Sequence, residues 1–252
     1  MKVEKFSLGN NKLIDVLDCD FCNPQVISAV GGGGKTSFCF TLARECVEIG
    51  LKVIVTTTTH MRVPEIGLSS TKDEIQKSLE TQGCAIAGVH PFGHRMCGVE
   101  DSVYDWMCEQ ADVVIVEADG AKCLPVKAPD VSHEPVIPKN TTHTAILAGL
   151  SAIGKPMDEV CFRLTEIGKL LEMDDFSKPL TEELLAKILV KGYDKVVTHP
   201  CTYVLNQADD EDMYQKALRV ASYYSDKKFI ATSLYGNKNE KSPEERFLEL
   251  IQ

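Results

Sequence analysis

The sequence lacks any apolar run of about 18 residues, so no segment is long enough to cross a membrane as a helix. Its first twenty residues, MKVEKFSLGNNKLIDVLDCD, lack the apolar core of a signal peptide. We therefore expect a cytoplasmic protein with no membrane partner. Internal repeats and low-complexity segments are also missing. With 252 residues, 44% of them hydrophobic, the chain is long enough to bury a sizeable core.

Positive charge is scarce. The chain has 27 lysines and arginines against 37 acidic residues, which gives a formal net charge of −10. No basic cluster could follow a phosphate backbone, so we expect no nucleic-acid partner. This balance does not argue against a single local anion site.

Paired cysteine motifs are nearly absent, although the chain has ten cysteines. Only Cys19 and Cys22 have the Cys-x-x-Cys spacing, and a zinc site would require a second such pair. The other cysteines are scattered without an export signal, which argues against a disulfide framework. We expect thiols in packed positions, with a redox role for Cys19 and Cys22 as the alternative.

The sequence does contain four consecutive glycines, Gly31–Gly34, in AVGGGGKTSF. Glycines cost backbone entropy and give a core nothing to pack, so such a run needs a purpose. It follows the β-branched stretch QVISAV and precedes an apolar pattern of helical period that ends at Gly50. Backbone N–H groups from Gly31 to Thr36 can converge on a phosphate there, with Lys35 at the β- and γ-phosphates and the Thr36 hydroxyl on Mg²⁺.

The full phosphate-loop motif places glycine where this chain has Ala29, but the strand–loop–helix context supports the prediction. A flexible linker is the alternative. The predicted ligands are Mg²⁺ and GTP or ATP. The predicted nucleotide-binding residues of this loop are Gly31, Gly32, Gly33, Gly34, Lys35, Thr36 and Ser37.

Apolar strands alternate with helical patterns along most of the chain. Strands are expected at 25–30, 52–59, 84–89, 112–117, 144–150, 202–206 and 228–233. Helices are expected at about 36–49, 70–83, 102–110, 157–172, 181–191, 210–225 and 242–251. This alternation predicts an α/β fold of the three-layer P-loop NTPase type, a mainly parallel sheet with helices on both faces. We expect one domain over residues 1–252, in which 151–192 either complete the helical cover or form a helical insertion.

The apolar run in ADVVIVEADGAK ends on Glu117 and Asp119. Parallel folds bind ligands at the carboxyl ends of their strands, where a carboxylate can hold Mg²⁺. Glu117 lies nearest the apolar run, so we predict that it binds the metal together with Thr36. Asp119 is predicted to position an attacking water. A solvated Asp-Gly turn is the alternative.

The stretch VTTTTH covers residues 55–60. One interpretation is that Thr57, Thr58 and Thr59 overrun the strand edge and contact Mg²⁺ or the γ-phosphate, as switch threonines do. The alternative is that the run reflects strand propensity alone. We take Thr58, with Lys35 and Asp119, as the catalytic candidates. His60 is expected to be an ordinary loop histidine, although imidazoles in general suit proton transfer near neutral pH.

Residues 120–143 carry four prolines and no clear periodicity. A loop of this length inside a domain is usually functional or disordered. We predict that Lys122, Lys127, His133 and Glu134 line a second-substrate pocket near the phosphates. An ordered, solvated loop is the competing interpretation.

Asn206 and Asp209 in YVLNQADD follow an apolar strand with the spacing of the guanine-reading element Asn-Lys-x-Asp. A carboxylate there accepts both the ring N–H and the exocyclic amine of guanine, which adenine cannot supply. Gln207 stands where lysine usually packs under the base. The segment 231–233 follows the next strand, where a supporting loop is expected. The pattern favours GTP over ATP.

The segments SAVGGGGKTS, VIVTTTTH, VIVEADGAKCLPVKAP, HEPVIP and VLNQAD occur in the order seen in the YqeC family. From about residue 13 to residue 235 the chain resembles this family, whose members are described as accessory proteins for a selenium cofactor or a selenium-dependent molybdenum hydroxylase. The resemblance implies a P-loop NTPase that helps mature such a hydroxylase or its cofactor precursor. It assigns the phosphate role to Gly31–Thr36 and the acidic motif to Glu117 and Asp119. The family's signature loop falls on Lys122, Lys127, His133 and Glu134.

Three functions remain open from the sequence. The first is a nucleotide-driven maturation factor that hydrolyses GTP or ATP slowly. The second is a small-molecule kinase or ligase, because the EADG strand end also resembles that of dethiobiotin synthetase-type NTPases. The third is a selenium or metal carrier with a structural nucleotide, in which Cys123 is either the carrier thiol or a packed residue. A homodimer is an open expectation, because dimers are common among NTPases of this build.

Overall fold

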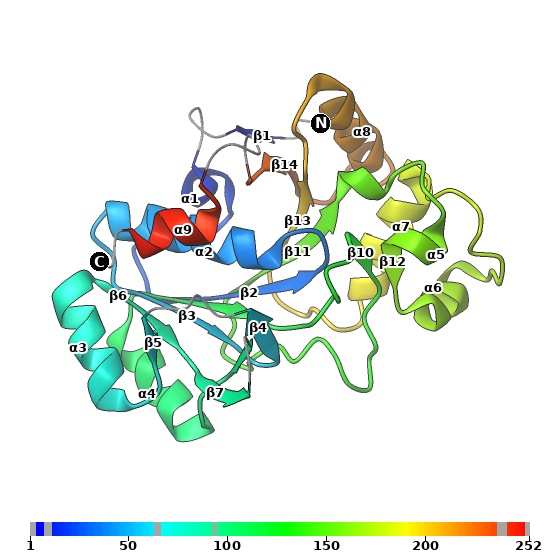
Figure 1. Cartoon of the computed structure of the whole chain (residues 1–252). Coiled ribbons are helices and arrows are strands. Elements are labelled where there is room, and N and C mark those ends of the chain that lie inside the picture. Colours follow the sequence, from blue (N-terminus) through cyan, green and yellow to red (C-terminus); the bar gives the residue numbers. More distant parts are fainter. Residues whose placement is uncertain (1–3, 8–11, 63–66, 93–94, 236–240, 250–252) are drawn as a thin grey trace.

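The computed structural model describes residues 4–7, 12–62, 67–92, 95–235 and 241–249. At its centre lies a nine-stranded sheet (Figure 1). In spatial order the strands are β1 (Glu4–Ser7), β14 (Phe229–Ser233), β13 (Cys201–Asn206), β11 (His143–Gly149), β2 (Gln25–Gly31), β9 (Val113–Glu117), β3 (Val53–Thr57), β6 (Cys84–Ala87) and β5 (Leu68–Ser69). Every neighbouring pair in this sheet is parallel. The carboxyl ends of its strands therefore share one edge.

Helices cover both faces of the sheet. The helices are α1 (Leu13–Val16), α2 (Lys35–Glu48), α3 (Lys72–Gln82), α4 (Asp101–Gln110), α5 (Met157–Val160), α6 (Leu164–Leu171), α7 (Glu182–Tyr193), α8 (Glu211–Ser222) and α9 (Pro243–Leu248), with a 3₁₀ turn η1 (Leu150–Ala152). Figure 1 shows α2 beside α9, where the rings of Phe40 and Phe247 lie 5.3 Å apart. The predicted three-layer α/β class with a mainly parallel sheet is confirmed.

The alternation of side chains along the strands creates two apolar layers. In β2, Val26 and Val30 point into a cluster with residues of α3, α4, α7 and α8. Ile27 and Ala29 point to the opposite face, into a cluster with residues of α1, α2 and α9. Successive side chains of a strand face opposite sides, so a strand buried on both faces reads as a continuous apolar run. This is why the sequence shows runs such as VVIV instead of an alternating pattern.

Local signals set several element boundaries as predicted. Thr71 caps α3 by accepting the backbone N–H of Glu74, whose side chain in turn accepts the N–H of Thr71. This reciprocal pair is a capping box. Gly83 ends the same helix in the left-handed conformation, with φ of 72°.

The single helix predicted at 157–172 is wrong. The segment forms α5, then the short strand β12 (Cys161–Phe162), then α6. The strand pairs in parallel with β10 (Val126–Lys127), so a tertiary partner 35 residues away overrides helical propensity. Arg163 then takes a positive φ of 68° before α6 begins.

A three-stranded antiparallel sheet lies after the threonine run and was not predicted. It orders β4 (His60–Arg62), β8 (Arg95–Cys97) and β7 (Val89–Phe92). Strands of three or four residues are too short to show a period in the sequence. Residues 151–192 include α7, which buries Leu185 and Ile188 in the same cluster as the sheet. This packing agrees with the prediction of one domain over residues 1–252, which stays a prediction.

In the part of the chain that is described, no helix has both the length and the apolar character needed to span a bilayer.

The stability of this fold should depend on Glu45 of α2. Its side chain is 2% exposed and accepts the backbone N–H of Ile14 at 3.1 Å, at the start of α1. Burial raises the pKa of this carboxyl from 4.5 to about 7, against the lowering effect of that hydrogen bond and of Arg44. The folded state therefore holds the proton more tightly than the unfolded state, and stability falls as pH rises from 4.5 to about 7.

We predict that Glu45→Gln, which keeps an acceptor and cannot ionise, removes this loss. The difference in the free energy of unfolding, Glu45→Gln minus the unsubstituted protein, should increase by about 3 kcal/mol as the pH rises from about 5 to about 8. Urea denaturation at a series of pH values measures the difference. Glu80→Gln, at an exposed position of α3, is the matched control and should show no such trend. A parallel pH profile for Glu45→Gln would contradict the burial argument.

Candidate functional site

The four glycines form the connection between β2 and α2. Gly33 and Gly34 have φ values of 72° and 116°, which side chains rarely adopt. A Cβ on Gly33 would overlap the backbone of Gly149, and one on Gly34 would overlap the Asn206 amide. The loop thus passes so close to β11 and β13 that only glycine fits.

The backbone donors of this loop are divided between two tasks. The Gly31 N–H donates to Asp119 Oδ2 at 3.0 Å. The Gly32 N–H donates to the Leu147 carbonyl oxygen of β11 at 2.9 Å, and the Gly33 N–H donates to the Leu124 carbonyl oxygen, before β10, at 3.2 Å. In this structure the protein itself satisfies these three N–H groups, and their contact with a phosphate stays a prediction. No side chain caps the N-terminus of α2 at Gly34. The N–H groups of the first turn of α2, together with the helix dipole, can therefore bind an anion.

Lys35 folds back onto the loop. Its Nζ lies 2.8 Å from the Gly31 carbonyl oxygen and 3.1 Å from Asp119 Oδ1, and the side chain is 5% exposed. Burial lowers the pKa of Lys35, but the Asp119 and Glu117 carboxylates outweigh it and the net shift is upward. The lysine is thus held as a cation at the base of α2.

Asp119 is fully buried, with one oxygen facing Lys35 and the other 3.1 Å from Lys127 Nζ. The predicted role of Asp119 in positioning an attacking water is not what this geometry shows. A carboxylate that is 0% exposed and shared by two lysines acts as their counter-ion.

Lys127 is also fully buried, which corrects its predicted role as a contact of a second substrate. Its Nζ lies 2.7 Å from Glu134 Oε2 and 2.7 Å from the Gly120 carbonyl oxygen. Arg163 continues the chain of charges, with 2.8 Å to Glu134 and 2.6 Å to Asp130. Burial raises the pKa of Glu134, but the hydrogen bonds from Lys127 and Arg163 hold it below its ordinary value. Arg163 was not predicted as a site residue, because it lies inside the helix expected at 157–172.

Glu117 and Thr36 meet at the start of α2. The Thr36 hydroxyl donates to Glu117 Oε2 at 2.7 Å, and Glu117 is 6% exposed. Burial raises the pKa of Glu117, against the lowering effects of Lys35 and of this hydrogen bond. A hydroxyl and a carboxylate side by side suit Mg²⁺, which takes few protein oxygens and completes its shell with phosphates and water. Among the described residues, no group of three or more His, Cys, Asp or Glu side chains could form a cage made only of protein.

The threonines after β3 bind backbone groups. Thr57 and Thr58 donate their hydroxyls at 2.7 Å to the carbonyl oxygens of Glu117 and Val136. The Thr58 hydroxyl thus ties this segment to Val136, and its catalytic role stays a prediction. Thr59 differs, since its buried Oγ1 has no hydrogen-bond partner.

The Asn206 side chain joins the loop after β13 to the glycine loop. Its Nδ2 donates to the Gly33 carbonyl oxygen at 2.8 Å, and its Oδ1 accepts the Thr232 hydroxyl at 3.1 Å. The amide is thus used inside the protein. Asp209 is exposed and accepts the Ser233 hydroxyl at 2.5 Å, and its contact with a base stays a prediction. The 231–233 segment contacts both residues, but it forms the end of strand β14 and not the loop that the sequence predicted.

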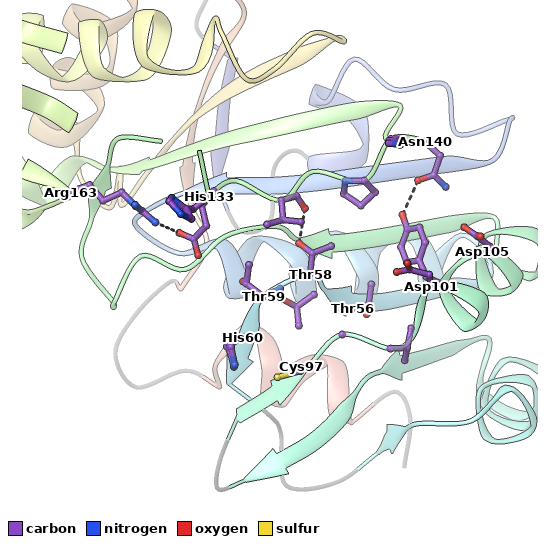
Figure 2. A pocket seen from close by; sticks show the side chains of 18 residues that line it. Thr56, Thr58, Thr59, His60, Cys97, Asp101, Asp105, His133, Asn140 and Arg163 are labelled. Carbon is purple, nitrogen blue, oxygen red and sulfur yellow. Dashed lines mark hydrogen bonds and ion pairs between the residues drawn. The ribbon is translucent and has the colours of Figure 1, made fainter. Parts of the chain in front are cut away.

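Two cavities open along this edge of the sheet. The smaller, about 390 Å³, is lined by Gly33, Gly34, Ser37, Gln207 and Asp209 among others. The larger, about 990 Å³, lies at the end of β3 and beside α4 (Figure 2). Its lining includes residues 56–60, Cys97, and two aspartates of α4, Asp101 and Asp105. His133, Glu134 and Arg163 line it as well.

The remaining candidates lie apart from these cavities. Lys122 is exposed, with its Nζ 5.1 Å from the Phe162 ring, so of the four predicted pocket residues only His133 and Glu134 line the larger cavity. Cys123 is exposed with φ of 62°. Cys19 and Cys22 are free thiols, and burial raises the pKa of Cys19 to about 12, which does not favour a redox thiolate.

Comparison with known proteins gives one family. A family model described as "YqeC protein" matches residues 27–165, more than half of the chain. A curated relative, "Uncharacterized protein YqeC" of Escherichia coli (strain K12), is 31% identical over an alignment of 150 residues, and the match covers 52% of this chain and 54% of that protein. The chain thus spans about half the length of the curated relative that it matches.

Two solved structures resemble the fold at low similarity. The hydrogenase maturation factor HypB from Archaeoglobus fulgidus is 11% identical with a TM-score of 0.38, covering 90% of this chain and 88% of that chain. The signal recognition particle receptor FtsY from Elizabethkingia anophelis is 14% identical with a TM-score of 0.40, covering 91% and 66%. At these scores neither structure bears on function.

The buried pairing of Lys127 with Asp119 predicts a large effect on stability. Lys127→Met keeps the side-chain length and removes one of the two cations that face a fully buried carboxylate. The free energy of unfolding should fall by about 3 kcal/mol or more. Urea denaturation measures it, and Lys122→Met, at an exposed lysine of the same loop, should cost less than about 1 kcal/mol. Equal losses for the two variants would show that Asp119 does not depend on Lys127.

Proposed function

The chain belongs to the YqeC family, and we propose that it binds a nucleoside triphosphate with Mg²⁺, GTP in preference to ATP. The observation that carries nucleotide binding is the 390 Å³ cavity, because it joins the glycine loop, the first turn of α2 and Asp209 in one space. A nucleotide site needs N–H donors for the phosphates at one end and a contact for the base at the other, with the ribose between them. The residues of this cavity can supply both. We further propose slow hydrolysis and a role in the maturation of a selenium-dependent molybdenum hydroxylase or its selenium cofactor; this role rests on the family resemblance alone.

The residues around the loop suggest how the phosphates would be held. The N–H groups of the first turn of α2 face the anion, and Lys35 supplies a positive charge. To reach a phosphate, the Lys35 ammonium exchanges its contacts with Asp119 and the Gly31 carbonyl for phosphate oxygens. Lys127 stays on Asp119, so the buried carboxylate keeps a counter-ion. Thr36 and Glu117 would hold Mg²⁺, which when bound neutralises charge on the β- and γ-phosphates.

The guanine preference rests on Asp209. The Asn206 side chain donates to the Gly33 carbonyl oxygen, so the segment that carries Asp209 is tied to the glycine loop. Its carboxylate can accept two N–H groups, and guanine presents two while adenine presents none in that arrangement. Gln207, with φ of 69°, occupies the turn beneath this site.

A second candidate function is a small-molecule kinase or ligase, with ATP or GTP as phosphoryl donor. The observation that favours it is the 990 Å³ cavity beside Glu117, on the far side from Asp209. Under this function nucleotide turnover would be negligible until an acceptor is added.

Lys35→Ala tests nucleotide binding. The substitution removes the cation nearest the phosphates, and we expect the affinity for Mg²⁺-GTP to fall at least about a hundredfold. Calorimetric titration with Mg²⁺ and GTP, ATP or CTP measures it. Lys155→Ala, at an exposed lysine, is the control and should bind as the unsubstituted protein does. Unchanged GTP affinity in Lys35→Ala would overturn the assignment of the loop.

Asp209→Asn tests the base contact. An amide can accept from only one of its two ends, so the preference for GTP over ATP should shrink by about tenfold. The same titrations measure it, with Asp212→Asn on α8 as a matched exposed control. If the unsubstituted protein binds ATP as well as GTP, Asp209 is an ordinary loop residue and the kinase or ligase function gains support.

A further inference from the structure

The base end of the smaller cavity lacks the lysine that usually packs under a guanine. Gln207 stands at that position of the guanine-reading element. Its Oε1 accepts the Ser151 N–H at 3.3 Å and lies where a Cβ on Gly149 would overlap it. The side chain thus ties the turn after β13 to η1, so a base in this cavity needs another residue to cover its face.

Tyr235 brings an aromatic ring to this cavity. It lines the cavity together with Asp209 and Met213, and it is 51% exposed. Among the residues that the structure describes, no other aromatic ring stacks on it. Aromatic rings contribute a large apolar area and commonly stack in parallel with a flat partner. Tyr235 is therefore available to a flat ligand.

The position of Tyr235 is set by the residue before it. Leu234 is 1% exposed and packs in the apolar cluster that includes residues of α2 and α9. Its N–H donates to Asn206 Oδ1 at 3.3 Å, and the Nδ2 of the same amide donates to the Gly33 carbonyl oxygen at 2.8 Å. The backbone that carries Tyr235 is thus tied to the glycine loop through one asparagine.

Met213, in the first turn of α8, is the second large apolar side chain at this cavity. Asp210 accepts its backbone N–H at 2.8 Å, which holds the start of the helix in place. Thioethers pack well against aromatic systems because sulfur is polarisable. Every base has a π-face, whereas its edge carries donors and acceptors. Tyr235 and Met213 suit the face of a base, and the Asp209 carboxylate suits its edge.

We propose that Tyr235 stacks on the base of the bound nucleotide and takes the place of the lysine that this chain lacks, with Met213 as a further apolar contact. The inference rests on the proposed function, since it takes the phosphates to lie on the glycine loop. The Ser233 hydroxyl donates to Asp209, so the end of β14 supports both the edge contact and, two residues later, the stacking ring. Tyr235 contributes affinity for any base, and Asp209 contributes the choice of base.

Tyr235→Ala tests the stacking. The affinity for Mg²⁺ with a non-hydrolysable GTP analogue should fall at least about fivefold, the lower end of what stacking on an aromatic side chain provides. Tyr235→Phe keeps the ring and should bind within about twofold of the unsubstituted protein. Tyr223→Ala is the matched control, because Tyr223 is also 51% exposed but lies at the end of α8, outside the lining of the cavity. Calorimetric titration measures all three.

Inorganic tripolyphosphate separates stacking from a structural effect, because it carries the phosphates without a base. With Mg²⁺ it should bind Tyr235→Ala and the unsubstituted protein equally. An unchanged affinity of Tyr235→Ala for the GTP analogue overturns the proposal. Equal losses for the analogue and for tripolyphosphate also overturn it, because they would show a displaced loop.

Lys35→Ala separates this proposal from the proposed function. If the GTP analogue loses affinity in Lys35→Ala but not in Tyr235→Ala, the proposed function stands and the stacking assignment fails. If it loses affinity in Tyr235→Ala but not in Lys35→Ala, the base contact stands and the assignment of the phosphates to the glycine loop fails. If the analogue does not bind the unsubstituted protein, both fail.

Discussion

The buried carboxylate of Asp119 is the interaction on which the site depends. It is fully inaccessible to solvent, and it receives the Gly31 N–H, the Lys35 ammonium and the Lys127 ammonium. A charge removed from water must be compensated by nearby partners. The glycine loop with the start of α2 is therefore held to two segments far from it in the sequence, the turn after β9 and the strand β10. The shape of the glycine loop follows from this constraint.

The same carboxylate begins a line of alternating charges that leaves the loop. Lys127 joins Asp119 to Glu134, and Glu134 joins Arg163 at the wall of the larger cavity. The loop and the cavity thus share one electrostatic network with a buried lysine at its centre. This gives the proposed nucleotide site a direct physical connection to the wall of the larger cavity.

The sequence predicted the features that local chemistry determines. The buried strands are readable because β-branched runs such as VVIV suit strands covered on both faces, and Thr71 with Glu74 is readable because a capping box lies within four residues. The glycine loop and Glu117 could be predicted from their places after apolar runs. The predicted class of fold followed from the alternation of these elements.

The rest could not be predicted, because it depends on partners distant in the sequence. The residues next to Lys127 in the sequence indicate an ordinary loop lysine. Its role as a buried counter-ion depends on the packing around Asp119. Arg163 follows β12, whose pairing with β10 interrupts a segment of helical propensity. Asn206 has the spacing of a base reader, yet its amide is used to hold Gly33, 173 residues away.

The most direct test of nucleotide binding at this loop is a crystal structure of the protein with Mg²⁺ and a non-hydrolysable GTP analogue. The account predicts that Lys35 Nζ has left Asp119 and the Gly31 carbonyl for the phosphates, while Lys127 remains on Asp119. It also predicts the base against Asp209. Phosphates bound elsewhere, with Lys35 still paired to Asp119, would contradict it.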